Sequence, residues 1–208
     1  DEDNNPGPRG DEKIVLTPLP VEVIEEPVIN IMNDPGIWVL LDDGCNYTSC
    51  SLAYHVNARG KLRKMGFDAM RRTNERVSIK GASGSVSTLG DYAMPLGITG
   101  QFSGMIIPGS LRHSVMEGDP QQKSGITPML LSRQDQGTLG LIKDQRANAI
   151  LLKDYPQERI RSARTHDSHL QVICISDLMT RSEWDQNMST AWSEFWIGTG
   201  EHKFAAKQ

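Results

Sequence analysis

The 208-residue sequence has few cysteines and no long apolar run, and each shortage excludes a class of protein. Its three cysteines, Cys45, Cys50 and Cys174, are odd in number and have neither disulfide-framework nor metal-ligand spacing, so we predict no disulfide and a reducing compartment. No run is long enough to span a bilayer, and no apolar stretch of signal-peptide type stands at the amino-terminal end. We therefore expect an intracellular, cytoplasmic location without membrane contact.

The sequence also lacks an excess of positive charge. Lys plus Arg number 22 against 26 Asp plus Glu, a formal net charge of -4, so no basic field points to a nucleic acid. One region is locally basic, but no aromatic residues interleave its charges as a base-stacking surface would need. We interpret this region as solvated surface and predict no direct nucleic-acid binding; its members are Lys61, Arg63, Lys64, Arg71, Arg72 and Arg76.

Turn-forming residues are abundant instead. The 19 glycines and 11 prolines separate short apolar runs, a composition that favours many short strands over long helices. We expect a disordered acidic tail over residues 1–13, one main domain over 14–154 and a C-terminal extension over 155–208. Within the extension, residues 155–167 should be a linker and residues 169–175 a strand.

One stretch combines an apolar run with charge. Residues 37–41 read Ile-Trp-Val-Leu-Leu without alternation, which predicts a strand covered on both faces, and Asp42, Asp43 and Gly44 follow at once. An ionised carboxylate there costs several kcal/mol, roughly, unless it is paired or hydrogen-bonded. Asp42 is therefore either a structural carboxylate that accepts backbone amides at the turn or a chemically active group.

Further elements follow in a defined order. An apolar stripe of Leu52, Val56, Leu62 and Met65 suggests a short helix. Residues 77–90 predict a hairpin whose tip is Gly81-Ala82-Ser83-Gly84, and no P-loop pattern follows these glycines. Residues 127–132 predict a strand leading into a short helix at 134–139. Residues 139–144 and 149–154 predict a closing hairpin.

The end of the chain predicts an amphipathic helix. Thr180 and Glu183 fit a capping box, and an apolar face follows at helical spacing, made of Trp184, Met188, Ala191, Trp192, Phe195 and Trp196. We expect this face to pack on its own domain rather than on a partner or a membrane. His166 and His169 lie in a polar segment without a third ligand, so we interpret them as solvated and predict no metal site.

Val39-Leu40-Leu41-Asp42-Asp43-Gly44-Cys45 resembles the active-site signature of retroviral-type aspartic proteases. The glycine-bearing hairpin and the later strand and helix follow in the order of a retropepsin subunit, so the resemblance covers roughly residues 31–154. The resemblance implies a mainly β fold, namely a retropepsin-like closed β-barrel with short helices. The C-terminal helix expected above would be added to this barrel. The chain is also similar to protease-like segments of retrotransposon polyproteins, so we expect it to belong to a larger polyprotein.

The resemblance implies an aspartic endopeptidase without cofactor or metal. A homodimer would bring two copies of Asp42 together to activate a water that attacks a peptide bond. The substrates would be protein chains, and the cleavage would serve the processing of a polyprotein. Asp43, Gly44 and Cys45 would complete the active-site loop. Gly81, Ala82, Ser83 and Gly84 would form a flap that closes over an extended peptide.

Two residues differ from the family pattern. Asp43 stands where the family has Thr or Ser, whose hydroxyl braces the paired loops across the dimer, and an aspartate donates a hydrogen bond only when protonated. Ser132 stands where the family often has Gly. The alternative function is therefore a catalytically inactive domain of the same fold that acts as a dimeric binding or assembly module.

Overall fold

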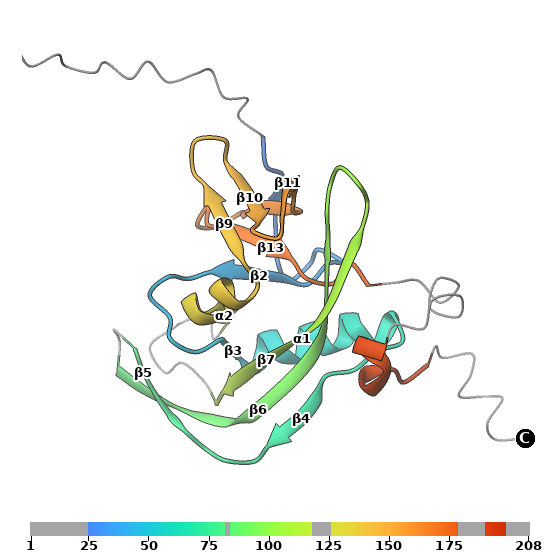
Figure 1. Cartoon of the computed structure of the whole chain (residues 1–208). Helices are drawn as coiled ribbons and strands as arrows, with labels where there is room; N and C mark the ends of the chain where they lie inside the picture. The colour runs from blue at the N-terminus through green and yellow to red at the C-terminus, as the bar shows by residue number, and fades with distance from the viewer. Residues whose placement is uncertain (1–24, 82–83, 118–125, 179–189, 199–208) are drawn as a thin grey trace, which may run out of the picture.

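The computed structural model describes residues 25–81, 84–117, 126–178 and 190–198 and is mainly β, as predicted (Figure 1). Its larger sheet has ten strands in the order β1-β12-β13-β2-β8-β3-β7-β6-β4, with β5 paired to β6. These strands are β1 (Val28–Ile29), β2 (Trp38–Leu41), β3 (Ser49–Ser51), β4 (Met70–Thr73), β5 (Ser78–Gly81), β6 (Gly84–Thr99), β7 (Ile106–Met116), β8 (Met129–Leu131), β12 (Ser162–Thr165) and β13 (Gln171–Cys174). A smaller sheet joins β9 (Leu141–Asp144), β10 (Ala149–Leu152) and β11 (Tyr155–Arg159).

Strand β2 lies inside the larger sheet and is buried on both faces, as its unbroken apolar run predicts. It pairs antiparallel with β13 and parallel with β8, in a register that places Leu41 opposite Leu131. Successive side chains of a strand point to opposite faces. Val39 accordingly belongs to the main core, whereas Trp38 belongs to a second cluster with Ala163 and Val172.

The predicted closed barrel is not found among the described strands, because the hydrogen-bonded path of the sheet ends at β1 and β4. The long strands β6 and β7 bend strongly (Figure 1), and a short contact brings β6 back to the chain after β13. Gly97 N donates to Ile175 O at 2.8 Å, and Asp177 N donates to Gly97 O at 3.1 Å. This curling depends on isolated contacts instead of a continuous ladder, including a further bridge between Gly100 and Ile160.

Gly97→Ala should therefore destabilise the protein. A Cβ at this position would lie 2.3 Å from the backbone oxygen of Asp177, so the two segments must separate. We expect a loss of about 3 kcal/mol in the free energy of unfolding, measured by urea denaturation. The matched control is Gly60→Ala, whose Cβ would meet nothing within 4 Å in an exposed helix turn and should stabilise by about 0.5–1 kcal/mol. Equal stability of both variants would contradict the proposed close packing.

Helix α1 (Leu52–Lys64) is present, but its buried face differs from the predicted stripe. Leu52 and Val56 are 42% and 60% exposed, and the helix buries Tyr54, His55, Ala58 and Leu62 instead. The difference arises because tertiary contacts fix the rotation of the helix: the Tyr54 hydroxyl donates to the carbonyl of Trp38 in β2. No helix in the described ranges combines the length and apolarity needed to cross a membrane.

The remaining predicted elements of the main domain are confirmed where they are described. Strands β5 and β6 form the expected hairpin, with Gly81 opposite Gly84, while Ala82 and Ser83 lie outside the described residues. Strand β8 leads into α2 (Arg133–Thr138), and β9 pairs with β10 as the closing hairpin.

The linker predicted over residues 155–167 is wrong, since this segment contains β11 and β12. The strand predicted over 169–175 is confirmed as β13, which pairs with β2 and β12. Ile160, Ile173 and Ile175 also belong to the main core. Residues on both sides of the expected division at 154 therefore share one sheet and one core.

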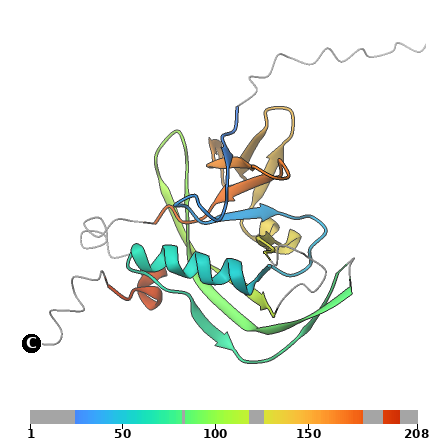
Figure 2. The ribbon, with the colours of Figure 1, turned by 180° about the vertical axis from the view of Figure 1, so that it is seen from behind.

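The described part of the C-terminal helix is a 3-10 helix, η1 (Thr190–Phe195), rather than the expected α-helix. Trp184 and Met188 lie outside the described residues. Trp192 and Phe195 are buried, which confirms that this segment packs on its own domain. Figure 2 shows η1 beside the C-terminal end of α1, where Asp68 N donates to Phe195 O at 3.0 Å.

Candidate active site

Asp42 follows β2 directly, and backbone hydrogen bonds define its position. Its N–H donates to Leu131 O of β8 at 3.2 Å, which extends the β2–β8 ladder by one residue. Its half-buried side chain accepts a hydrogen bond from Gly44 N at Oδ1, over 2.9 Å. Within the part of the chain that the structure describes, Oδ2 makes no hydrogen bond. One carboxylate oxygen thus serves the turn, and the other is available.

Gly44 allows this turn through close packing rather than through a positive φ. A Cβ at position 44 would lie 3.3 Å from Asp42 Oδ1, closer than an ordinary contact. Cys45 N also donates to Asp42 O at 3.3 Å, so the loop curls tightly behind the carboxylate. The predicted loop residues Asp42, Gly44 and Cys45 therefore come together.

Asp43 points to a different partner. Its carboxylate, 70% exposed, forms an ion pair of 2.7 Å with the ammonium group of Lys143 in β9. An ion pair this exposed contributes at most about 1 kcal/mol to stability, because water screens it. Its importance is local, since it places a positive charge beside the active-site loop and offsets the second carboxylate.

A cavity of about 280 Å³ lies beside Asp42 and is lined by Leu40, Leu41, Asp42, Lys143, Leu170 and Gln171. Three leucines line it together with one carboxylate, one ammonium group and the amide of Gln171. A second cavity of about 380 Å³ shares Leu40 and Leu170 with the first, so the two adjoin. Leucine walls with few polar groups are typical of sites that bind apolar side chains.

Sequence reasoning missed Lys143, Leu170 and Gln171 as site residues. Lys143 comes from the closing hairpin, and Leu170 and Gln171 come from the segment at the start of β13. No local pattern marks these residues, because only strand pairing brings them next to Asp42.

A polar network supports the loop from behind. Arg133 N donates to Cys45 O at 3.1 Å, and Ser132 N donates to Thr48 Oγ1 at 2.9 Å. The Thr48 hydroxyl donates in turn to the carboxylate of Asp135. Ser132 is the N-cap of α2, since its hydroxyl accepts from Asp135 N at 3.1 Å. Ser132 therefore has a defined structural role, capping the helix behind the loop at Asp42.

Cys45 is not arranged as a nucleophile. Burial, together with the nearby Asp42 carboxylate, raises the pKa of its thiol, and the thiol donates a hydrogen bond of 2.7 Å to Tyr47 O. A raised pKa keeps the thiol protonated at neutral pH, and the thiolate is the reactive form. Asp42 is therefore a better candidate than Cys45 for a reactive group in this loop.

The predicted flap residues make no described hydrogen bond with the loop at Asp42. Among the described residues, no hydrogen bond joins the β5–β6 hairpin to Asp42, and Gly81 and Gly84 pair with each other. The hairpin and the loop after β2 lie at the same end of the molecule, at the left of Figure 1 and at the right of Figure 2. This placement is compatible with a hairpin that moves toward a bound peptide.

His166 and His169 are exposed, which confirms the interpretation that they are solvated. His166 Nδ1 lies 3.0 Å from the carboxylate of its neighbour Asp167 in an exposed pair. These residues therefore make no centre comparable with the loop at Asp42.

No model of a known protein family matches this chain, and a search of curated proteins finds none that is similar to it. The assignment of a function consequently depends on the residues of the site and on their geometry.

Proposed function

We propose that this chain is one subunit of an aspartic endopeptidase of retroviral type and that Asp42 is its catalytic carboxylate. The observation that carries the proposal is the position of Asp42 at the end of a doubly buried strand. There the carboxylate lines a cavity together with three leucines and uses only one oxygen in the turn. A carboxylate that the backbone holds in place beside a cavity, with one oxygen free of the turn, is the type of group that acid–base catalysis uses.

A second copy of the chain supplies the second carboxylate, in a twofold dimer that brings the two Asp42 side chains together. One Asp42, ionised, takes a proton from water as the water attacks the scissile carbonyl. The other Asp42, protonated, donates to the carbonyl oxygen. The two share one proton because like charges this close cannot both ionise cheaply.

The Asp43–Lys143 ion pair makes this arrangement electrostatically reasonable. Four carboxylates would gather around the twofold axis, and their repulsion would oppose the ionised form of Asp42. Lys143 offsets the charge of Asp43 in each subunit. The dimer then keeps the charge balance of a single catalytic pair.

The substrate is a protein chain bound in extended form. Leu40, Leu41 and Leu170 would contact apolar side chains of the substrate, and its backbone would pair as an added strand. The β5–β6 hairpin, with Gly81, Ala82, Ser83 and Gly84 at its tip, would close over it as a flap. We place this activity in the processing of a polyprotein inside the cell.

One observation favours a second function. Asp43 is exposed and occupied by Lys143, so it does not provide the hydroxyl brace that paired active-site loops need. If catalysis requires that brace, the chain would instead act as a catalytically inactive dimeric binding or assembly module. A substitution at position 43 can therefore distinguish the two functions by experiment.

Cleavage of a mixed peptide library at about pH 5 tests the proposal, because a shared proton requires acid conditions. The wild type and Asp43→Thr are compared at concentrations where sedimentation confirms a dimer. We expect both to cleave next to apolar residues, with the faster rate in Asp43→Thr. Cleavage by Asp43→Thr alone would favour the inactive module, and no cleavage by either dimer would refute the endopeptidase.

A further inference from the structure

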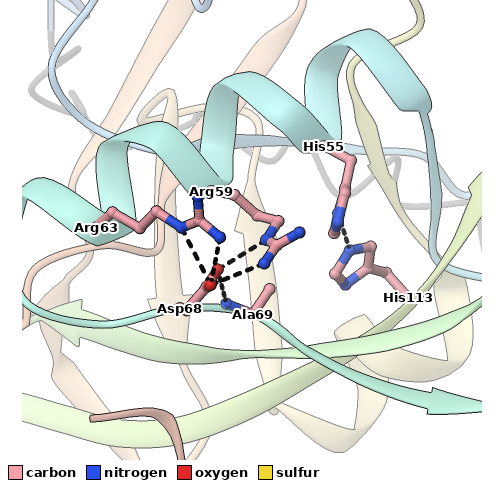
Figure 3. A network of polar contacts seen from close by, with 6 residues as sticks. All are labelled: His55, Arg59, Arg63, Asp68, Ala69 and His113. Carbon is pink, nitrogen blue, oxygen red and sulfur yellow. Dashed lines mark hydrogen bonds and ion pairs between the residues drawn. The ribbon is translucent and has the colours of Figure 1, made fainter. Parts of the chain in front are cut away.

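A second group of chemically capable side chains lies in the core, away from the loop at Asp42. Cys50 of β3, His55 of α1 and His113 of β7 each offer a ligand atom, and these three atoms lie within 4.8 Å of one another. All three side chains are at most 2% exposed. Figure 3 shows the two imidazole rings facing each other, with His55 Nδ1 3.0 Å from His113 Nε2.

The scaffold holds these three positions firmly. Strand β3 pairs with β7 so that Cys50 lies opposite Val115, two residues after His113. Ser51 ends β3 and caps α1, and its hydroxyl donates to Thr127 O at 3.0 Å, which orients the first turn carrying His55. The Tyr92 ring covers the pair, with its centroid 4.3 Å from that of His55.

The hydrogen bond between the histidines does not satisfy them. His55 Nε2 is buried and lacks a hydrogen-bond partner within the described residues, whereas the backbone of Leu111 hydrogen-bonds to the His113 ring. A buried polar atom without a partner costs about 1–3 kcal/mol. A neutral imidazole nitrogen offers a lone pair to a metal, and each of these two buried rings turns one nitrogen toward the other.

The distances suit a metal ion. Bond lengths of about 2.0–2.3 Å place two ligand atoms roughly 3.3–3.9 Å apart in tetrahedral or trigonal geometry. The observed 3.0 Å between the facing nitrogens lies just below this separation, and the 4.8 Å limit of the cluster lies above it. Two imidazoles and one thiolate exclude magnesium and calcium, which prefer oxygen ligands.

Charge and coordination number select the metal. One thiolate balances the charge of a monovalent copper ion, so the complex is neutral and suits an apolar core. A zinc ion would leave one positive charge buried and would need a fourth ligand, since structural zinc is almost always four-coordinate. We propose that Cys50, His55 and His113 form a binding site for one Cu⁺ ion per chain.

Binding exchanges one proton for one metal ion. Burial raises the pKa of the Cys50 thiol well above its usual range. The thiol therefore loses its proton to solvent only as sulfur bonds to Cu⁺, because a coordinating thiol is deprotonated, and no electron is transferred. Because the ligands are buried together only in the folded chain, Cu⁺ binds the folded state and raises its stability. The reducing compartment that the cysteine pattern predicts is also where copper is monovalent.

Titration of the full chain with Cu⁺ under anaerobic, reducing conditions, in competition with a chromogenic Cu⁺ chelator, tests the site. We expect one equivalent bound per chain and a higher unfolding temperature with Cu⁺ than without it. Cys50→Ala and His113→Gln should each weaken binding by at least about 100-fold, since they remove direct ligands.

Cys174→Ala is the matched control, because Cys174 is equally buried but has no histidine in a metal-ligand group with it. It should bind Cu⁺ like the wild type, and circular dichroism confirms that each variant is folded. X-ray absorption should show sulfur and nitrogen ligands at copper. Equal binding by all variants, no binding by the wild type, or binding of Zn²⁺ in place of Cu⁺ would each overturn the proposal.

Discussion

Asp42→Asn is expected to lower peptide cleavage at least about 1000-fold, because both members of the proposed catalytic pair lose their acid–base function. An amide neither takes a proton from water nor donates one as a carboxylic acid. Its oxygen can still accept the 2.9 Å hydrogen bond from Gly44 N, so the turn is retained. The unfolding free energy should therefore change by less than about 1 kcal/mol.

The measurement is kcat/KM for one cleaved peptide at about pH 5, with thermal unfolding and sedimentation of the same samples. Asp154→Asn is the control, since Asp154 is an exposed carboxylate outside the loop. It should leave cleavage unchanged. If Asp42→Asn cleaves within a few-fold of the wild type while remaining dimeric, Asp42 is a structural carboxylate and the catalytic assignment fails.

Trp192→Ala should cost about 3–5 kcal/mol of unfolding free energy, the range found for large aromatic side chains in cores. Trp192 is fully buried and packs edge-on against Phe67, with centroids 6.1 Å apart. Its indole N–H donates to Leu96 O at 3.0 Å and to Gly109 O at 3.1 Å. The substitution removes the apolar contact and leaves both carbonyls of β6 and β7 without this donor.

Urea denaturation of Trp192→Ala, Trp192→Phe and Phe102→Ala separates these contributions. Trp192→Phe keeps an aromatic ring but loses the donor, so we expect a loss of about 1–2 kcal/mol. Phe102→Ala removes a ring that is 67% exposed and should cost less than about 1 kcal/mol. A loss below about 1 kcal/mol for Trp192→Ala would mean that η1 adds little to the core.

Local sequence determined the elements of this protein. The unbroken apolar run before Asp42 predicted a strand buried on both faces, and glycines at 81 and 84 predicted the hairpin that β5 and β6 form. These predictions succeeded because side-chain alternation, turn residues and caps act over a few neighbouring residues. The exposed position of His166 also followed from its polar surroundings.

Tertiary structure decided which elements meet. Trp38 and Cys174 pair although 136 positions separate them, and this pairing makes residues after 154 part of the main core. It also brings Leu170 to the cavity at Asp42, while the packing of α1 places His55 beside His113. No local pattern encodes such contacts, because the burial of apolar surface from the whole chain selects the strand order and the helix rotation.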